Sequence, residues 1–152
     1  MTVTVAREAV RGTGIRALLE QAWALSDSLY PAESNHHLDE SGLDVPDVSF
    51  FVARQDGEAR GCGGLKRVDA AYGEVKSLFV DPAARGLGLA RALLAAIEAE
   101  ARAQGLSLLR LETGIRQPAA IGLYEATGFR RIGPFGDYRA DPLSLFMEKA
   151  IR

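Results

Sequence analysis

The chain has 152 residues, of which 47% are hydrophobic and 25% charged, as expected of a single soluble globular domain over residues 1–152. Its formal net charge is −2 at pH 7, so charge gives no reason to expect binding to nucleic acid or to a membrane. A single cysteine excludes a disulfide within the chain, and the lack of a signal peptide or of an apolar run near ~20 residues leads us to expect a cytoplasmic protein.

The N-terminal third predicts one strand, one helix and a polar connection. Residues 2–6 alternate in polarity and predict a strand. Apolar residues then recur at helical spacing from Ile15, and Thr13 is the predicted N-cap of a helix that ends near Leu29. The segment 30–37 is polar, contains a proline and predicts a loop or a short helix.

A β-hairpin is predicted next. Residues 48–54 and 59–68 form its strands, because the Asp56-Gly57 pair between them favours a tight hairpin turn. Glycines weaken a strand, so the glycines of the second strand mark either a β-bulge or the close approach of a ligand. They are Gly61, Gly63 and Gly64.

The stretch from Glu74 to Gly105 predicts a strand, a glycine-rich loop and a long helix. Residues 74–80 supply the strand, which ends at Asp81-Pro82 because proline has no N–H to give a ladder. The loop 85–90 leads directly into the helix, and Gly105 is its left-handed C-terminal cap. Small residues at a helix start leave backbone N–H groups uncovered, and the helix dipole adds positive charge, so this loop predicts a phosphate or pyrophosphate site.

The last third completes a mixed sheet. Residues 107–113 predict a strand, and a helix follows with Pro118 in its first turn and Gly128 just past its end. Residues 129–132 and 143–149 predict the last two strands. The whole pattern predicts an α/β (α+β) fold with a mixed, mostly antiparallel sheet of about 6–7 strands and helices on both faces.

Two segments together resemble the GCN5-related N-acetyltransferase (GNAT) family. The first is Arg85-x-x-Gly88-x-Ala90, between a strand that ends in Phe79-Val80-Asp81-Pro82 and a long amphipathic helix. The second runs from Ala120 to Phe129 and is similar to the family's Ala-Ile-x-Leu-Tyr-x-x-x-Gly-Phe segment. A dinucleotide fingerprint would need a glycine at Arg91, and a P-loop would need Gly-Lys-(Ser/Thr), so both other glycine-loop readings fail.

The chain also resembles a bacterial branch of that family. The marks of this branch are Tyr30-Pro31-Ala32-Glu33-Ser34 and Phe135-Gly136-Asp137-Tyr138.

The resemblance implies acetyl-CoA as the donor and direct transfer of acetyl to an amine, without a metal. In this family two central strands splay apart and the pantetheine arm of the cofactor lies between them; here the first of these strands is 74–80. Gln117 stands where many relatives carry an asparagine and offers the same amide on a longer stem. The expected cofactor contacts are Leu78, Phe79, Val80, Arg85, Gly86, Leu87, Gly88, Leu89, Ala90, Arg91, Gln117 and Tyr124.

Tyr124 and Glu74 are the catalytic residues that the resemblance implies. Tyr124 matches a tyrosine that protonates the CoA thiolate in many relatives, and a phenol of pKa near ~10 is protonated at neutral pH. The alternative is that Tyr124 only packs and hydrogen-bonds to the cofactor sulfur. Glu74 has the offset of the general base in the histone-acetylating branch, but it shares a strand face with Lys76, so a plain ion pair is the alternative.

The acceptor side is less determined. The candidate substrate contacts are Glu33, Ser34, His36, Thr113 and Arg116. For the loop residues among them a solvated loop is the alternative, and Arg116 could equally meet a CoA phosphate. Glu112 and Thr113 end the same strand and could both line the acceptor pocket, and Thr113 is the favoured wall of the two. Adjacent histidines diverge, and no acidic partners show ligand spacing, so we expect no metal.

The expected partner is a small-molecule amine. A protein N-terminus or lysine is the enzymatic alternative, and a non-catalytic CoA-binding sensor on the same fold is the alternative from another class. A homodimer is compatible with the sequence, and neither nucleic acid nor membrane is an expected partner.

Overall fold

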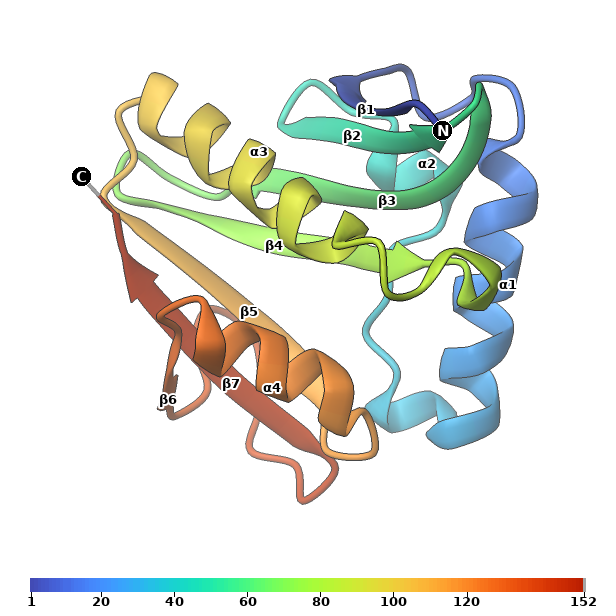
Figure 1. The fold of residues 1–152 in the computed structure, drawn as a ribbon. Coiled ribbons are helices and arrows are strands. Elements are labelled where there is room, and N and C mark those ends of the chain that lie inside the picture. Colours follow the sequence, from blue (N-terminus) through green and yellow to red (C-terminus); the bar gives the residue numbers. More distant parts are fainter. Residues whose placement is uncertain (152) are drawn as a thin grey trace.

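A single seven-stranded sheet, in the order β1-β2-β3-β4-β5-β7-β6, runs through the computed structural model, which describes residues 1–151 (Figure 1). The β4–β5 pair is parallel and the other neighbours are antiparallel, which confirms the predicted mixed, mostly antiparallel sheet. The strands are β1 (Val3–Arg7), β2 (Val48–Gln55), β3 (Glu58–Arg67), β4 (Tyr72–Val80), β5 (Leu108–Gly114), β6 (Arg130–Ile132) and β7 (Ser144–Ala150).

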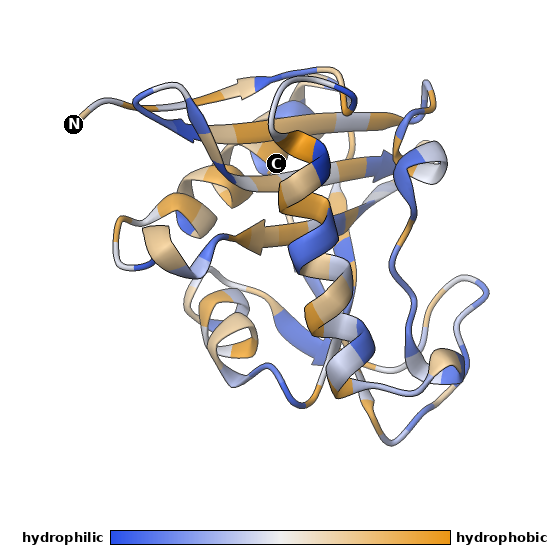
Figure 2. Ribbon diagram, turned by 90° about the vertical axis from the view of Figure 1, so that its right-hand side faces the viewer, coloured by the Kyte–Doolittle hydropathy of each residue, from blue (hydrophilic) through white to orange (hydrophobic). Residues whose placement is uncertain are grey.

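Helices cover both faces of this sheet, as alternate residues of β2 show. Phe51 packs in the cluster that holds α3 and α4, whereas its neighbour Phe50 packs in the cluster that holds α1 and α2. Figure 2 shows apolar and polar residues alternating along α1, as expected of a helix with one buried face. The helices are α1 (Ile15–Leu29), α2 (Glu40–Leu43), α3 (Leu89–Ala103) and α4 (Pro118–Ala126), with single 3₁₀ turns at Ala32–Ser34 and Pro82–Ala84.

The central parallel strands splay apart, as the resemblance implied. β4 and β5 pair only where Tyr72, Gly73 and Glu74 face Leu108, Leu109 and Arg110. Beyond Glu74 the two strands diverge, which Figure 1 shows between the green and the orange strand. The later residues of β4 therefore keep β3 as a ladder partner but have none on the β5 side.

A β-bulge shapes β4 at this point. The register with β3 shifts between Cys62 and Gly64, so that two residues of β4, Ser77 and Leu78, lie opposite Gly63. Ser77 adopts a left-handed conformation with a φ of 56°, which is strained for a residue with a side chain. Of the two explanations for the glycines of β3, the bulge is confirmed.

Close packing of α3 is the second reason for these glycines. A Cβ on Gly61 would lie 3.0 Å from Leu93, and one on Gly63 would lie 3.1 Å from Ile97. Gly61 and Gly63 thus allow α3 to approach the sheet.

Most element boundaries agree with the sequence to within one or two residues, but the predicted cap of α1 was wrong. Gly14, not Thr13, is the N-cap, with a left-handed φ of 79° and no side-chain hydrogen bond to the helix. Gly105 and Gly128 have positive φ values just past α3 and α4, as predicted. None of the helices within residues 1–151 is long and apolar enough to cross a membrane.

Candidate functional site

The glycine-rich loop before α3 leaves its backbone open. Gly86 and Gly88 have left-handed φ values of 84° and 75°, and a Cβ at either position would meet no heavy atom within 4 Å apart from chain neighbours. This open space leaves the backbone at the start of α3 accessible, and amides there, together with the helix dipole, are suited to an anion; we call this region the anion cradle. Arg85 and Arg91 line the same hollow and add positive charge.

This loop borders a cavity of about 640 Å³, which we call the loop cavity. Residues of β4 form its floor, and Gln117, Ala120 and Tyr124 form the wall on the α4 side. Every predicted cofactor contact except Leu87 lines it; the Leu87 side chain is exposed on the same loop. The loop cavity therefore combines an anion cradle at one end with a mostly apolar trough.

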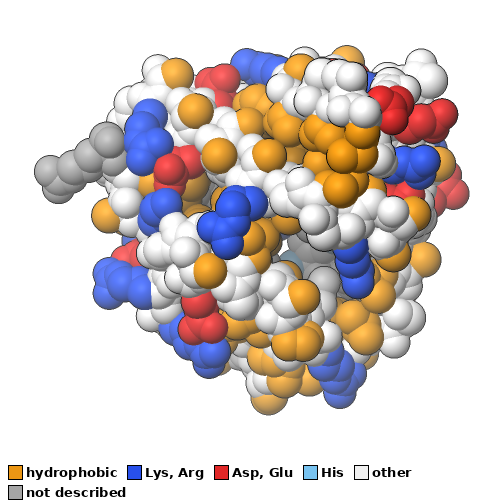
Figure 3. Space-filling view, viewed as in Figure 1, with side chains coloured by type: hydrophobic (Ala, Val, Ile, Leu, Met, Phe, Trp, Pro, Cys, Tyr) orange, Lys and Arg blue, Asp and Glu red, His pale blue; other side chains and the backbone are white. Residues whose placement is uncertain are grey.

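A smaller cavity of about 130 Å³, which we call the inner cavity, adjoins the loop cavity. Figure 3 shows the surface hollowed between α3 and α4, with a histidine side chain in its depth. The two cavities are adjacent and share six lining residues, which are Leu25, Leu78, Phe79, Gln117, Ala120 and Tyr124.

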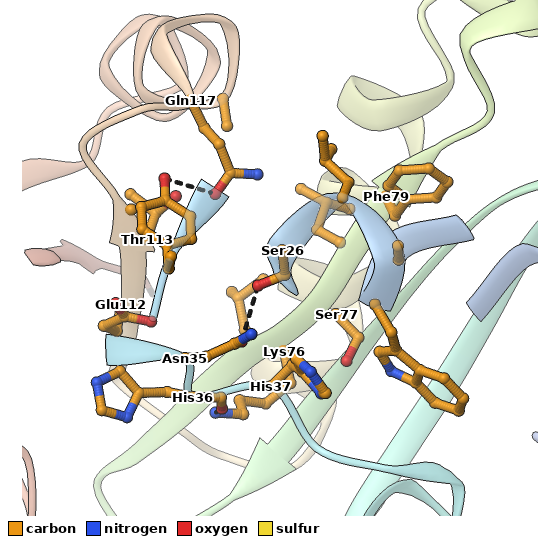
Figure 4. Close-up of a pocket in the computed structure, with 18 of the residues that line it drawn as sticks. Ser26, Asn35, His36, His37, Lys76, Ser77, Phe79, Glu112, Thr113 and Gln117 are labelled. Atoms are coloured by element: carbon orange, nitrogen blue, oxygen red, sulfur yellow. Dashed lines mark hydrogen bonds between the residues drawn. The ribbon is translucent and has the colours of Figure 1, made fainter. Parts of the chain in front are cut away.

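The inner cavity lies in the gap between the splayed strands. Figure 4 shows Glu112 and Thr113 of β5 on one side and Ser77 and Phe79 of β4 on the other, with His37 between them at the lower edge. The loop that follows α1 closes this edge, so α1, β4, β5 and α4 all contribute to the walls.

Tyr124 is one of the six residues that line both cavities. It comes from α4, is 6% exposed, and packs its ring against Phe129 with 5.6 Å between ring centroids. Burial raises the pKa of its phenol well above the ordinary value, and the nearby Glu112 carboxylate raises it further. The hydroxyl therefore stays protonated at neutral pH, as a general acid must be.

Glu112 is a second titratable group in the inner cavity. It precedes the buried Thr113 near the end of β5 and accepts a hydrogen bond from Ser144 Oγ at 2.8 Å. Burial raises the pKa of its carboxyl, while Ser144, His36 and Lys76 act to lower it and Glu74 raises it. A carboxylate with a raised pKa beside a protonated phenol is an arrangement suited to acid–base chemistry.

Glu74 lies elsewhere. Its Oε2 is 3.2 Å from Lys76 Nζ and accepts a hydrogen bond from the Tyr138 hydroxyl at 2.5 Å. The ion pair with Lys76, one of the two alternatives from the sequence, is thus confirmed. Glu74 lines a third hollow of about 580 Å³, the outer cavity, and does not line the inner cavity with Tyr124. Its role as a base remains a prediction.

The predicted substrate contacts divide among the three cavities. Ser34, His36 and Thr113 line the inner cavity, whereas Glu33 lines the outer cavity. Arg116 lines the loop cavity, where its guanidinium donates to the Leu29 carbonyl at 2.5 Å, so it lies on the side of the anion cradle. Within residues 1–151 no cluster of three His, Cys, Asp or Glu side chains could hold a metal ion.

Sequence reasoning missed several walls of the inner cavity. Tyr30 packs so close to Gly114 that a Cβ there would lie 1.9 Å from its hydroxyl oxygen. Its hydroxyl accepts from the Arg116 N–H at 3.1 Å and donates to Gln117 Oε1 at 3.3 Å. Trp23, Lys76 and Ser77 line the cavity as well. The branch-specific segments were the available sequence signal for this region. The segment that begins at Tyr30 borders the inner cavity, and the segment that begins at Phe135 borders the outer cavity.

Comparison with known proteins agrees with this geometry. Residues 13–129 match the model of the "Acetyltransferase (GNAT) family". The chain is 51% identical over 150 residues to an IAA acetyltransferase of Azospirillum brasilense, covering 98% of each chain. Among solved structures it is similar to a putative acyl-CoA N-acyltransferase of Klebsiella pneumoniae, with a TM-score of 0.83, 36% identity, and coverage of 99% of this chain and 98% of that one. The PaiA N-acetyltransferase of Thermoplasma acidophilum, solved with coenzyme A, shares the fold, with a TM-score of 0.76, 16% identity and coverage of 99% of each chain.

Proposed function

Because this chain belongs to the GNAT family and is therefore an N-acetyltransferase, we propose that it transfers acetyl from acetyl-CoA directly to a small-molecule amine in a ternary complex. One observation carries the proposal. The loop cavity, with its anion cradle, adjoins the inner cavity, where Glu112 lies, and Tyr124 lines both. Donor and acceptor can thus reach the same point from two sides.

The groups that line the loop cavity match the parts of coenzyme A. The open amides of Gly86 and Gly88, together with Arg85 and Arg91, suit the diphosphate, and the apolar trough suits the pantetheine arm. The residues of β4 beyond Glu74 have no ladder partner on the β5 side, so their backbone groups are available to hydrogen-bond that arm. When bound, acetyl-CoA supplies the acetyl group as an activated thioester.

The chain's own residues then move the protons. Glu112 accepts a proton from the ammonium of the acceptor, which leaves a neutral nitrogen able to attack. The bulge at Ser77 interrupts the β3–β4 ladder beside the inner cavity, and backbone N–H groups at such a bulge would stabilise the oxygen on which negative charge develops. Tyr124 donates its proton to the leaving sulfur, and the second proton that the attacking nitrogen loses restores the Tyr124 hydroxyl, so that the products are an amide and the free thiol of CoA.

We assign the base role to Glu112 rather than to Glu74 because of their positions. Glu112 lines the inner cavity together with Tyr124, whereas Glu74 is held by Lys76 and Tyr138 on the wall of the outer cavity. A general base must lie within hydrogen-bond reach of the proton it takes, directly or through one water.

The test is release of free CoA thiol when the protein, acetyl-CoA and a panel of amines are mixed. The panel contains simple primary amines, the relative's namesake compound IAA, and a peptide with a free N-terminus. We expect turnover with small amines and little with the peptide, because the inner cavity measures only about 130 Å³. Binding of acetyl-CoA without turnover of any acceptor would favour a sensor instead.

A further inference from the structure

Lys76 and Glu112 both line the inner cavity, but Lys76 forms its ion pair with Glu74 rather than with Glu112. Among the residues that line this cavity, Lys76 is the one with a lysine or arginine side chain. Each of its three ammonium hydrogens has an acceptor. The acceptors are Glu74 Oε2 at 3.2 Å, the Tyr138 hydroxyl at 3.0 Å and the His36 carbonyl at 3.2 Å. Lys76 therefore has no donor left for an anionic group on a substrate.

Glu112 has no such direct ion pair, although the charges of His36 and Lys76 act on it from a distance and lower its pKa. One of its oxygens accepts from Ser144 Oγ, and no lysine or arginine within residues 1–151 forms an ion pair with its carboxylate. Desolvation of an unpaired carboxylate is unfavourable, which is reflected in its raised pKa. A cation placed beside it would supply the missing charge.

The remaining walls combine apolar side chains with polar ones such as Ser26, Ser77 and Thr113. Leu25, Leu78, Phe79, Ala120 and the ring of Trp23 line the cavity. Its volume, about 130 Å³, is slightly less than the roughly 150 Å³ of an apolar cavity that holds benzene. A single ring or a short branched chain fills such a space, whereas a fused ring system does not.

We propose that the acceptor is a compact primary amine that binds as an ammonium against Glu112 and carries no carboxylate next to its nitrogen. This inference rests on the proposed function and narrows it. The Glu74–Lys76–Tyr138 cluster acts as a filter, because it occupies the one lysine or arginine side chain of the cavity wall that could otherwise receive a carboxylate.

Three matched compounds test this selection in the wild-type enzyme. Benzylamine has one ring and an ammonium, phenylglycine adds a carboxylate on the same carbon, and naphthylmethylamine adds a second ring. We expect kcat/KM for benzylamine to exceed that for phenylglycine by ~10²-fold, since an unpaired buried charge is strongly disfavoured. Naphthylmethylamine should fall ~10-fold or more below benzylamine, because overpacking is costly.

The variant Glu74→Gln tests the filter itself. Loss of the carboxylate frees Lys76 to meet a substrate anion, so the ratio of kcat/KM for phenylglycine to that for benzylamine should rise ~10-fold. Glu125→Gln is the matched control, because it also replaces one carboxylate with an amide. Glu125 lies on α4 beside Tyr124 in sequence and pairs at the surface with Arg131 at 3.6 Å. The control should leave the ratio unchanged.

A binding measurement keeps this inference separate from the proposed function. Thermal shifts are recorded for the wild-type protein with CoA plus each of the three compounds, and benzylamine should stabilise it most. Equal turnover or equal stabilisation by phenylglycine, or an unchanged ratio in Glu74→Gln, overturns the acceptor class while the acetyltransferase stands. Stabilisation by benzylamine without any thiol release would overturn the proposed function alone.

Discussion

Two carboxylates on neighbouring strands compete for the role of general base, and the structure separates them by their surroundings. Glu112 faces the cavity that contains Tyr124, and Glu74 is paired with Lys76. The base works in its ionised form, so the rate falls as the pH drops through its pKa. Because burial raises the pKa of Glu112, the acidic limb of the pH–rate profile should lie above the ordinary carboxyl value of about 4.3.

Two amide variants distinguish the carboxylates. Glu112→Gln should remove this limb and lower kcat/KM by ~10²-fold or more. Glu74→Gln should keep the limb but move it to lower pH, because the negative charge of Glu74 raises the pKa of Glu112. The measurement is kcat/KM across pH with benzylamine. If the limb instead disappears in Glu74→Gln and persists in Glu112→Gln, Glu74 is the base after all.

Tyr124 allows a separate prediction about the leaving group. Tyr124→Phe removes the proton donor but keeps the ring that packs on Phe129, so the fold should persist. We expect kcat to fall ~10²-fold, while the affinity for acetyl-CoA, measured by calorimetry, changes little. An unchanged kcat would mean that Tyr124 only packs against the cofactor and that the thiolate leaves without its help.

At the scale of elements, the end of β5 and the start of the loop after α1 depend on each other. Gly114 has no side chain, and the Tyr30 ring occupies the space that a Cβ would need. In turn the Tyr30 hydroxyl bonds to the backbone of Arg116 and the amide of Gln117, which fixes the turn into α4 and thus the helix that carries Tyr124. The absence of a side chain at Gly114 therefore lets β5, the loop after α1 and the turn into α4 pack together around the inner cavity.

Gly114→Ala tests this coupling. The new Cβ would lie 1.9 Å from the Tyr30 hydroxyl, so the ring must move and lose both hydrogen bonds. We expect a loss of ~1–3 kcal/mol in unfolding free energy and a higher KM for the amine. Gly122→Ala is the control, since a Cβ there in α4 would meet no atom within 4 Å, and alanine should stabilise the helix by up to ~1 kcal/mol. Equal melting temperatures for the two variants would refute the coupling.

Over the whole molecule, local sequence patterns predicted most of the fold and the residues of the loop cavity, but not those of the inner cavity. The strand, glycine loop and helix around Gly88 are consecutive in sequence, so propensity, capping and the family motif all indicate the same structure. The inner cavity could not be predicted in this way, because it joins residues far apart in the chain. Whether Glu112 or Glu74 borders Tyr124 depends on where β4 and β5 cease to pair, and no local pattern records that point.

The same limit of local patterns explains why the sequence favoured Thr113 over Glu112 as a wall of the acceptor pocket and gave Glu112 no catalytic role. Alternation along a strand shows which residues share a face, but not which face meets the cavity once the sheet splays. Both side chains line the inner cavity because the end of β5 has no β4 neighbour to cover it.

The last prediction concerns how the two halves of the molecule are held together. β4 and β5 share only three paired residues, and the loop cavity is lined by α3 from one half and α4 from the other. A ligand that fills this cavity should therefore stabilise both halves at once. At a hundredfold excess over its dissociation constant, CoA should add about 2.7 kcal/mol to the unfolding free energy. For a domain of about this size, each kcal/mol raises the melting temperature by roughly 2–4 °C.

Pantetheine, which lacks the diphosphate, is the control at equal concentration, because the amides at Gly86 and Gly88 would have no anion to bind. Equal stabilisation by the two compounds would show that the cradle before α3 does not hold the diphosphate, and the assignment of the donor site would have to be abandoned.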